Sequence, residues 1–241
     1  MTKKKLFDTV IFDLDNTLYP YHENHVRGVK AAHKIYTKKY RCSFASFLQK
    51  FMYYEEQNNK LLPKQAAAHD RRLFFQHMFE KEHNKIEYRM VLDMYEAYWH
   101  AMIKGIKLDA GVRKLFKWLK KHDIKIGLIT DLTVDVQFRK IIHTKLEDAF
   151  DVIVTSEEAG IEKPHKKIFQ LCLKKLGSRP QKSIMIGDNF QRDILGAQSL
   201  RMKTIWVKRD QKNETKKKPD FVVKYADDIQ EILESLYFGL E

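Results

Sequence analysis

Six short apolar runs, separated by segments with helical periodicity, dominate the hydrophobic pattern of the chain. Several are rich in β-branched residues and almost continuously apolar, which is typical of strands buried on both faces of a parallel sheet. The runs cover residues 8–12, 125–129, 151–154, 183–186, 203–207 and 221–223, and helices are predicted between them over residues 112–121, 167–176 and 191–200. This alternation predicts an α/β fold with a doubly wound parallel sheet, a Rossmann-like core.

The gap between the first and second runs is too long for an ordinary crossover connection. Apolar positions within it repeat every three or four residues, which indicates amphipathic helices. The clearest of these segments surround Val29 and Met94 and cover residues 44–54 and 66–79. We therefore predict a four-helix cap over residues 20–106, inserted into a core made of residues 1–19 and 107–241.

The composition adds a strong positive charge to this picture. The chain has 45 Lys and Arg against 32 Asp and Glu, a formal net charge of +13. Such a surplus attracts anionic partners, and it does not by itself distinguish among nucleic acid, a membrane surface and phosphorylated metabolites.

The apolar runs and the cysteines indicate where in the cell the protein is expected to lie. No run approaches the ~18 consecutive apolar residues of a membrane span, and the first apolar run is too short for the core of a signal peptide. Cys42 and Cys172 are far apart and outside any metal-binding spacing, so neither a disulfide framework nor a zinc finger is indicated. We expect a soluble, cytoplasmic protein with no membrane partner.

The first apolar run ends in two carboxylates. Asp13 and Asp15 follow it, one residue apart, in the segment DTVIFDLDNTLYP, and Thr17 comes next. Two such charges repel, and each raises the proton affinity of the other unless a cation lies between them. Mg²⁺ commonly binds one or two protein carboxylates together with substrate phosphate and water. The pair therefore indicates a Mg²⁺ site at the end of the first strand.

Further polar residues stand at the ends of other predicted strands. Thr130 closes the second strand, Lys163 follows the third, and Asp188 follows the fourth, with Asn189 and Asp193 just after it. In a parallel sheet these ends meet at one edge, where open α/β sheets bind their ligands. A hydroxyl, an ammonium and several carboxylates around one small volume suit a phosphoryl group held by a metal ion and a lysine.

Taken in order, the segments FDLDNTL, LIT, IEKP and IGDNFQRD resemble the four motifs of the haloacid dehalogenase (HAD) superfamily of phosphohydrolases. The helical insert after the first motif is similar to the cap of the subgroup that contains phosphoglycolate, nucleotide and sugar phosphatases. The resemblance spans nearly the whole chain, and the ordered set is far more specific than any single motif. The presence of Asp15 favours a phosphatase over the branch of the family that cleaves carbon–halogen bonds.

The resemblance implies a reaction and a role for each residue. Asp13 is expected to attack phosphorus and become an aspartyl phosphate, while Asp15 protonates the leaving alcohol and later deprotonates the hydrolytic water. Thr130 and Lys163 are expected to hold the phosphoryl oxygens, and Asp193 to orient Lys163 or a metal-bound water.

The resemblance also implies a metal site. Mg²⁺ is expected to be bound by Asp13, Asp188 and the main-chain carbonyl of Asp15. The residues expected to support these ligands without reacting are Thr17, which orients Asp15 or holds the loop, Asn189 and Asp193.

Three places depart from the family pattern, the first being the segment KPHKKIF, where His165, Lys166 and Lys167 add charge beside the expected site. Asp131 follows Thr130, where a neutral residue is frequent, and adds negative charge beside the expected phosphate. Arg201 stands where the family usually has Gly, so the turn there must avoid a positive φ or accept strain.

Three functions are compatible with these features. The leading prediction is a Mg²⁺-dependent phosphatase that hydrolyses a small phosphorylated metabolite, such as a sugar phosphate or nucleotide, through an aspartyl phosphate. The alternatives are a nucleic-acid-binding protein that uses its basic surface with little catalysis, and a phosphomutase. Binding alone does not need the reactive set, so we do not expect a nucleic acid partner; the sequence indicates no oligomeric state.

Two groups of residues in the predicted cap have more than one interpretation. His22 and His25 have a spacing that could bind a metal, although no third ligand is evident, and otherwise they cap the first helix or face the cleft. Aromatic residues at helical spacing are interpreted mostly as the core of the cap rather than a base-stacking platform: Tyr53, Tyr54, Tyr95, Tyr98 and Trp99.

Overall fold

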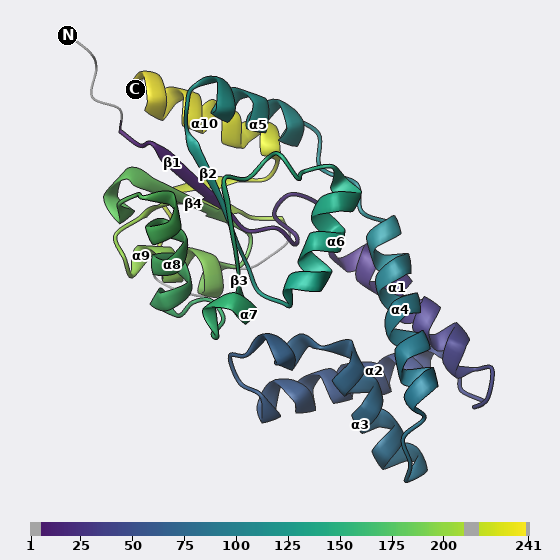
Figure 1. Ribbon diagram of the computed structural model, residues 1–241. Helices are drawn as coiled ribbons and strands as arrows, with labels where there is room; N and C mark the ends of the chain where they lie inside the picture. Colours follow the sequence, from purple (N-terminus) through teal and green to yellow (C-terminus); the bar gives the residue numbers. More distant parts are fainter. Residues whose placement is uncertain (1–5, 210–216, 240–241) are drawn as a thin grey trace.

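The computed structural model describes residues 6–209 and 217–239 of the 241-residue chain. Within these residues one parallel sheet has six strands in the order β3-β2-β1-β4-β5-β6 (Figure 1). The strands are β1 (Thr9–Phe12), β2 (Lys125–Thr130), β3 (Val152–Thr155), β4 (Ser183–Gly187), β5 (Lys203–Val207) and β6 (Phe221–Val223). Each predicted strand is confirmed to within one residue at either end.

Helices cover both faces of the sheet (Figure 1). Because successive strand residues point to opposite faces, Val10 and Phe12 of β1 pack in one hydrophobic cluster and Ile11 in another. The first cluster includes residues of α5 (Val112–Lys121), α6 (Val134–Thr144) and α10 (Ala226–Phe238), and the second includes residues of α7 (Ser156–Ala159), α8 (Lys166–Leu176) and α9 (Leu195–Gln198). The predicted doubly wound α/β class is confirmed.

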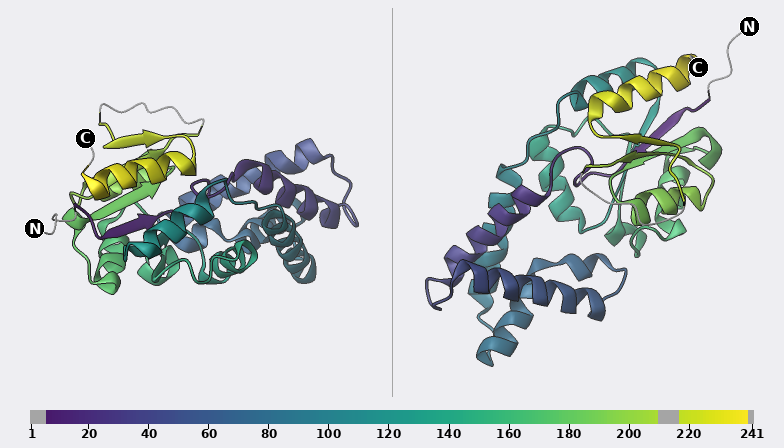
Figure 2. Two further views of the ribbon diagram at one scale, coloured as in Figure 1. Left: turned by 90° about the horizontal axis from the view of Figure 1, so that it is seen from above. Right: turned by 180° about the vertical axis from the view of Figure 1, so that it is seen from behind.

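The segment between β1 and α5 is helical and extends away from the sheet (Figure 2). Its helices α1 and α4 run side by side, and they approach closely at Gly28, where an added Cβ would lie 2.8 Å from the ring of Tyr98. The elements of the segment are α1 (His22–Tyr36), α2 (Phe44–Leu61), the short 3-10 helix η1 (Ala66–His69), α3 (Arg71–His83) and α4 (Tyr88–Lys104). Its treatment as a separate cap over residues 20–106 stays a proposal.

The predicted continuous helix over residues 66–79 is wrong. The chain leaves the helical region at Asp70, which has ψ of 112° and accepts a hydrogen bond from the main-chain N–H of Arg72 at 2.9 Å. Asp70 therefore caps α3 and separates it from η1.

The helix predicted over residues 191–200 is also irregular. It begins with one wide π-helical turn, η3 (Phe190–Ile194), and becomes α-helical only at Leu195. Such turns are frequent at functional sites, and this one carries Asp193.

Most of the aromatic residues assigned to the cap core are buried there. Tyr54, Tyr95, Tyr98 and Trp99 have exposed fractions of 5% or less, whereas Tyr53 is 55% exposed and lies outside the core. The interpretation as core is therefore wrong for Tyr53. Among the described residues, no helix combines the length and the apolar character needed to cross a bilayer.

Candidate active site

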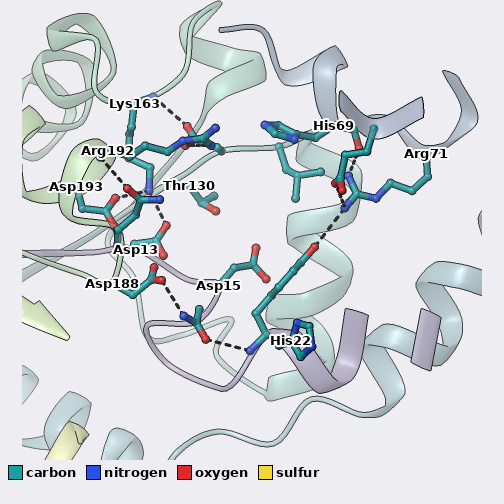
Figure 3. Close-up of a pocket in the computed structure, with 16 residues that line it drawn as sticks. Asp13, Asp15, His22, His69, Arg71, Thr130, Lys163, Asp188, Arg192 and Asp193 are labelled. Atoms are coloured by element: carbon teal, nitrogen blue, oxygen red, sulfur yellow. Dashed lines mark hydrogen bonds and ion pairs between the residues drawn. The ribbon is translucent and has the colours of Figure 1, made fainter. Parts of the chain in front are cut away.

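The carboxyl ends of the central strands converge on one pocket. Phe12, the last residue of β1, is paired with Leu128 of β2 and Ile186 of β4, so the residues after these strands share one edge of the sheet. A pocket of about 360 Å³ opens there. It brings together seven of the predicted site residues, namely Asp13, Asp15, Thr130, Lys163, Asp188, Asn189 and Asp193 (Figure 3).

Lys163 lies between two carboxylates. Its Nζ donates hydrogen bonds to Oδ1 of Asp13 at 2.6 Å and Oδ1 of Asp193 at 2.7 Å, and its side chain is almost fully buried. Burial opposes the charge of Lys163, but the two carboxylates outweigh it and raise its pKa well above the usual value. A permanent cation therefore stands beside Asp13.

The carboxylates of Asp13, Asp188 and Asp193 form a buried cluster, with one oxygen of each within 4.8 Å of the others. Burial, opposed by Lys163, raises the pKa of Asp13 to about 7. Burial likewise raises the pKa of Asp193. Repelling carboxylates in a site of this size are the donor set that a hard divalent cation prefers, so the residues present fit Mg²⁺.

Thr17 and Asn16 hold these carboxylates in place. The hydroxyl of Thr17 donates to Oδ2 of Asp13 at 3.0 Å and accepts from the main-chain N–H of Asp188 at 3.0 Å. The amide of Asn16, whose φ of 63° is one that asparagine tolerates, donates to Oδ2 of Asp188 at 2.8 Å. Thr17 thus contacts the two expected metal ligands rather than the carboxylate of Asp15.

Asp193 reaches the site because residue 187 is glycine. A Cβ added to Gly187 would lie 2.4 Å from Oδ2 of Asp193, so a larger residue would displace that carboxylate. The main-chain N–H of Asn189 donates to the same oxygen at 2.9 Å. Asn189 also accepts a hydrogen bond from the main-chain N–H of Arg192 at 3.0 Å, which fixes the start of η3.

Asp15 has partners that sequence reasoning missed. Nζ of Lys140, on α6, lies 2.8 Å and 2.6 Å from its two carboxylate oxygens, and Tyr19 and Gln137 donate further hydrogen bonds at 2.5 Å and 3.2 Å. Burial opposes ionisation of Asp15, but Lys140 and these hydrogen bonds outweigh it and lower its pKa. One signal existed in the sequence, because Gln137 and Lys140 are three residues apart and so share a helix face.

The negative charge of Asp131 is balanced by a nearby cation. Its Oδ1 accepts a hydrogen bond from the main-chain N–H of Lys163 at 3.0 Å, and its Oδ2 lies 3.3 Å from Nη1 of Arg192. The extra carboxylate therefore orients the Lys163 loop and pairs with a cation. The next residue, Leu132, has φ of 135°, a strained value for a residue with a side chain.

Residues of the helical segment form the opposite wall of the pocket. Figure 3 shows His22, His69 and Arg71 facing the carboxylates from this side. His25 points elsewhere and contacts the hydroxyl of Tyr98 at 2.7 Å. The two histidines are therefore separated, and only His22 lines the pocket.

The two walls meet beside Lys163. The main-chain N–H of Glu162 donates to the carbonyl of Lys64 at 3.0 Å. Nε2 of His69 lies 2.8 Å from Oε1 of Glu162, an ion-pair distance without the alignment of a hydrogen bond.

Residues 10–207 match the family of haloacid dehalogenase-like hydrolases. Because the match covers most of the chain, the protein belongs to this family, and the resemblance of its four motifs is confirmed. A ribulose-1,5-bisphosphate 5-phosphatase of Halopiger xanaduensis is 32% identical over 197 residues, which are 81% of this chain and 82% of that protein.

Two further comparisons concern a second phosphatase and a solved structure. A glyceraldehyde 3-phosphate phosphatase of Pyrococcus furiosus is 34% identical over 142 residues, which are 57% of this chain and 59% of that protein. The solved structure of a 2-haloacid dehalogenase from Pseudomonas syringae has a TM-score of 0.77 at 20% identity and covers 95% of this chain and 98% of that one. At this identity the structural likeness shows the fold alone.

Proposed function

We propose that the protein is a Mg²⁺-dependent phosphatase that hydrolyses a small phosphorylated metabolite through an aspartyl phosphate, in the cytoplasm. The observation that carries the proposal is the placement of Lys163 between Asp13 and Asp193 at the edge of a buried carboxylate cluster. Relatives named as phosphatases of ribulose bisphosphate and glyceraldehyde 3-phosphate support it.

In the first half of the reaction, a carboxylate oxygen of Asp13 attacks phosphorus while the ester P–O bond breaks. The departing alcohol takes a proton from Asp15, which draws it from the ammonium group of Lys140 to which it is hydrogen-bonded. Thr130 and Lys163 line the pocket beside Asp13 and hold the phosphoryl oxygens.

In the second half, water attacks the phosphorus of the aspartyl phosphate and gives a proton to Asp15, which returns it to Lys140. The bond between phosphorus and Asp13 breaks, inorganic phosphate leaves, and Asp13 is restored. Mg²⁺, when bound, would supply positive charge that neutralises the phosphoryl oxygens. Asp13, Asp188 and the main-chain carbonyl of Asp15 are the residues that would hold it, supported by Thr17, Asn189 and Asp193.

The test is the release of inorganic phosphate from a panel of sugar phosphates, nucleotides and p-nitrophenyl phosphate, with Mg²⁺ and with EDTA. Asp13→Asn should abolish turnover, because the amide is not a nucleophile, and EDTA should do the same in the wild type. Asp93→Asn, on the exposed face of α4, is the matched control and should leave turnover unchanged. Full turnover by Asp13→Asn would refute the proposal.

A further inference from the structure

The wall opposite the carboxylate cluster carries a buried cation and an acid. Arg71 has an exposed fraction of 2%, yet it lines the pocket, and Glu55 lines it beside Arg71. Oε1 of Glu55 lies 3.6 Å from Nη2 of Arg71, beyond hydrogen-bonding distance. The two opposite charges partly neutralise each other, but no hydrogen bond joins the two side chains.

Arg71 is fixed rigidly at this wall. Its guanidinium donates to the carbonyl of His69 at 2.6 Å and to the hydroxyl of Tyr21 at 3.2 Å. It also lies over the rings of Phe74 and Trp99, with centroid distances of 5.0 Å and 5.4 Å. Among the described residues its Nε has no hydrogen-bond partner. That Nε is itself buried, but among the described residues Nη1 donates only to His69, so its second N–H stays available to a ligand in the pocket.

Glu55 supplies an acceptor next to this donor. Its side chain is 30% exposed, and within the described part of the chain its carboxylate accepts no hydrogen bond. The other cations that line the pocket lie on the carboxylate-cluster side and are paired, Lys163 with Asp13 and Arg192 with Asp131. An anionic group placed there would be attracted by Arg71 and repelled by Glu55, so this pair gives it little net attraction.

From this arrangement we propose that the Arg71–Glu55 wall selects phosphate esters whose far end carries uncharged hydroxyl and carbonyl oxygens. Arg71 donates to a carbonyl or hydroxyl oxygen, and Glu55 accepts from a hydroxyl. A far end that carries a carboxylate or a second phosphate is disfavoured by repulsion from Glu55. The volume of about 360 Å³ is near the lower limit of ligand pockets, which favours short hydroxy-aldehyde or polyol phosphates.

This inference rests on the proposed function and names its substrate class. The test compares kcat/KM for two esters of equal length, glyceraldehyde 3-phosphate and 3-phosphoglycerate, which differ in an aldehyde against a carboxylate. We expect the wild type to prefer the aldehyde by about 10-fold or more. Glu55→Gln keeps the shape of the side chain and removes its charge. It should lower the ratio of the two kcat/KM values at least several-fold, mainly through a lower KM for 3-phosphoglycerate.

Glu56→Gln is the matched control, because Glu56 is the next residue of α2 and pairs with Lys60 at the surface. It should leave the ratio unchanged. A wild-type preference for 3-phosphoglycerate, equal rates on both esters, or an unchanged ratio in Glu55→Gln would overturn the selectivity while the phosphatase function stands. No phosphate release from any ester, p-nitrophenyl phosphate included, would overturn the proposed function and the selectivity with it.

Discussion

Nζ of Lys140 lies 2.6 Å from Oδ2 of Asp15, although the two residues are 125 positions apart in the chain. Lys140 is fully buried, and its ammonium reaches both oxygens of the carboxylate. The ion pair fixes the orientation of the residue proposed as general acid and base, and it keeps a proton donor in contact with it. The pair therefore belongs to the chemistry of the site as well as to its packing.

Replacement of Lys140 should impair proton transfer more than attack at phosphorus. In Lys140→Met, we expect kcat for an alkyl phosphate to fall by about 100-fold, because Asp15 loses its orienting partner. The loss for p-nitrophenyl phosphate should be much smaller, since its leaving group needs little protonation. Steady-state kinetics on both esters tests this, with Lys114→Met, at an exposed position of α5, as the control. Equal losses on both esters would contradict this role.

The metal-free protein should lose stability as the pH rises from about 4 to about 7. Asp13 has an ordinary pKa of 3.8 and a pKa of about 7 in the fold, so in this window the native state keeps a proton that the unfolded chain has released. The free energy of unfolding then falls with rising pH. The raised pKa of Asp193 acts in the same direction.

Urea denaturation in EDTA at about pH 5 and about pH 8 measures this slope. Asp13→Asn should flatten it, and an unchanged slope in that variant would assign the effect to other groups. Mg²⁺ should reverse the trend, because it binds ionised carboxylates, so the rise in Tm on adding it should grow with pH. Asp15 acts oppositely at lower pH: its depressed pKa contributes stability that is lost as the pH falls below its ordinary value.

Because Leu132 is strained, its glycine variant should be more stable than its alanine variant, the reverse of the usual order. Its φ of 135° suits glycine alone, whereas its side chain is 8% exposed and packs in the core. Leu132→Gly and Leu132→Ala both lose this packing, but only glycine relieves the strain. We expect the glycine variant to be more stable by about 1 kcal/mol, measured by urea denaturation.

Leu119, buried in helix α5, provides the control. There Leu119→Ala should be more stable than Leu119→Gly by about 1 kcal/mol, because glycine costs more conformational entropy in a helix. The same order at both positions would show that Leu132 is not strained.

Arg201 adopts a positive φ and accepts backbone strain, which was one of the two possibilities that the sequence left open. Its φ is 63°, and its side chain is exposed, so Arg201→Gly removes strain without loss of packing. We expect a gain of up to about 1 kcal/mol in the free energy of unfolding, the relief of a left-handed residue less the added entropy of the unfolded chain. Asn84→Gly should gain less, because asparagine tolerates its φ of 53°. A destabilised Arg201→Gly would contradict this account.

The sheet and the carboxylate side of the pocket could be predicted because their determinants are local. Each apolar run marks a strand, and the rule that parallel strand ends share one edge brings Asp13, Thr130 and Asp188 together. Only the contacts among these residues needed the structure. Thr17, for example, joins Asp13 to Asp188 rather than orienting Asp15.

The opposite wall and the partner of Asp15 could not be predicted in this way. Lysine and arginine are almost never fully buried unless paired, so a sequence pattern assigns them to the surface. Lys140 is buried because α6 packs against α4, where Trp99 lies 5.3 Å from its Nζ. Arg71 is the first residue of α3, which starts beside the pocket because Asp70 breaks the predicted helix over residues 66–79.

The main-chain bond from Glu162 to Lys64 joins the helical segment to the residue just before Lys163. If the helical segment moved away from the sheet, either this hydrogen bond would break or the loop that carries Glu162 and Lys163 would move with the segment. Under the proposed function, entry of the ester and release of phosphate would then both require this one hydrogen bond to break or that loop to move.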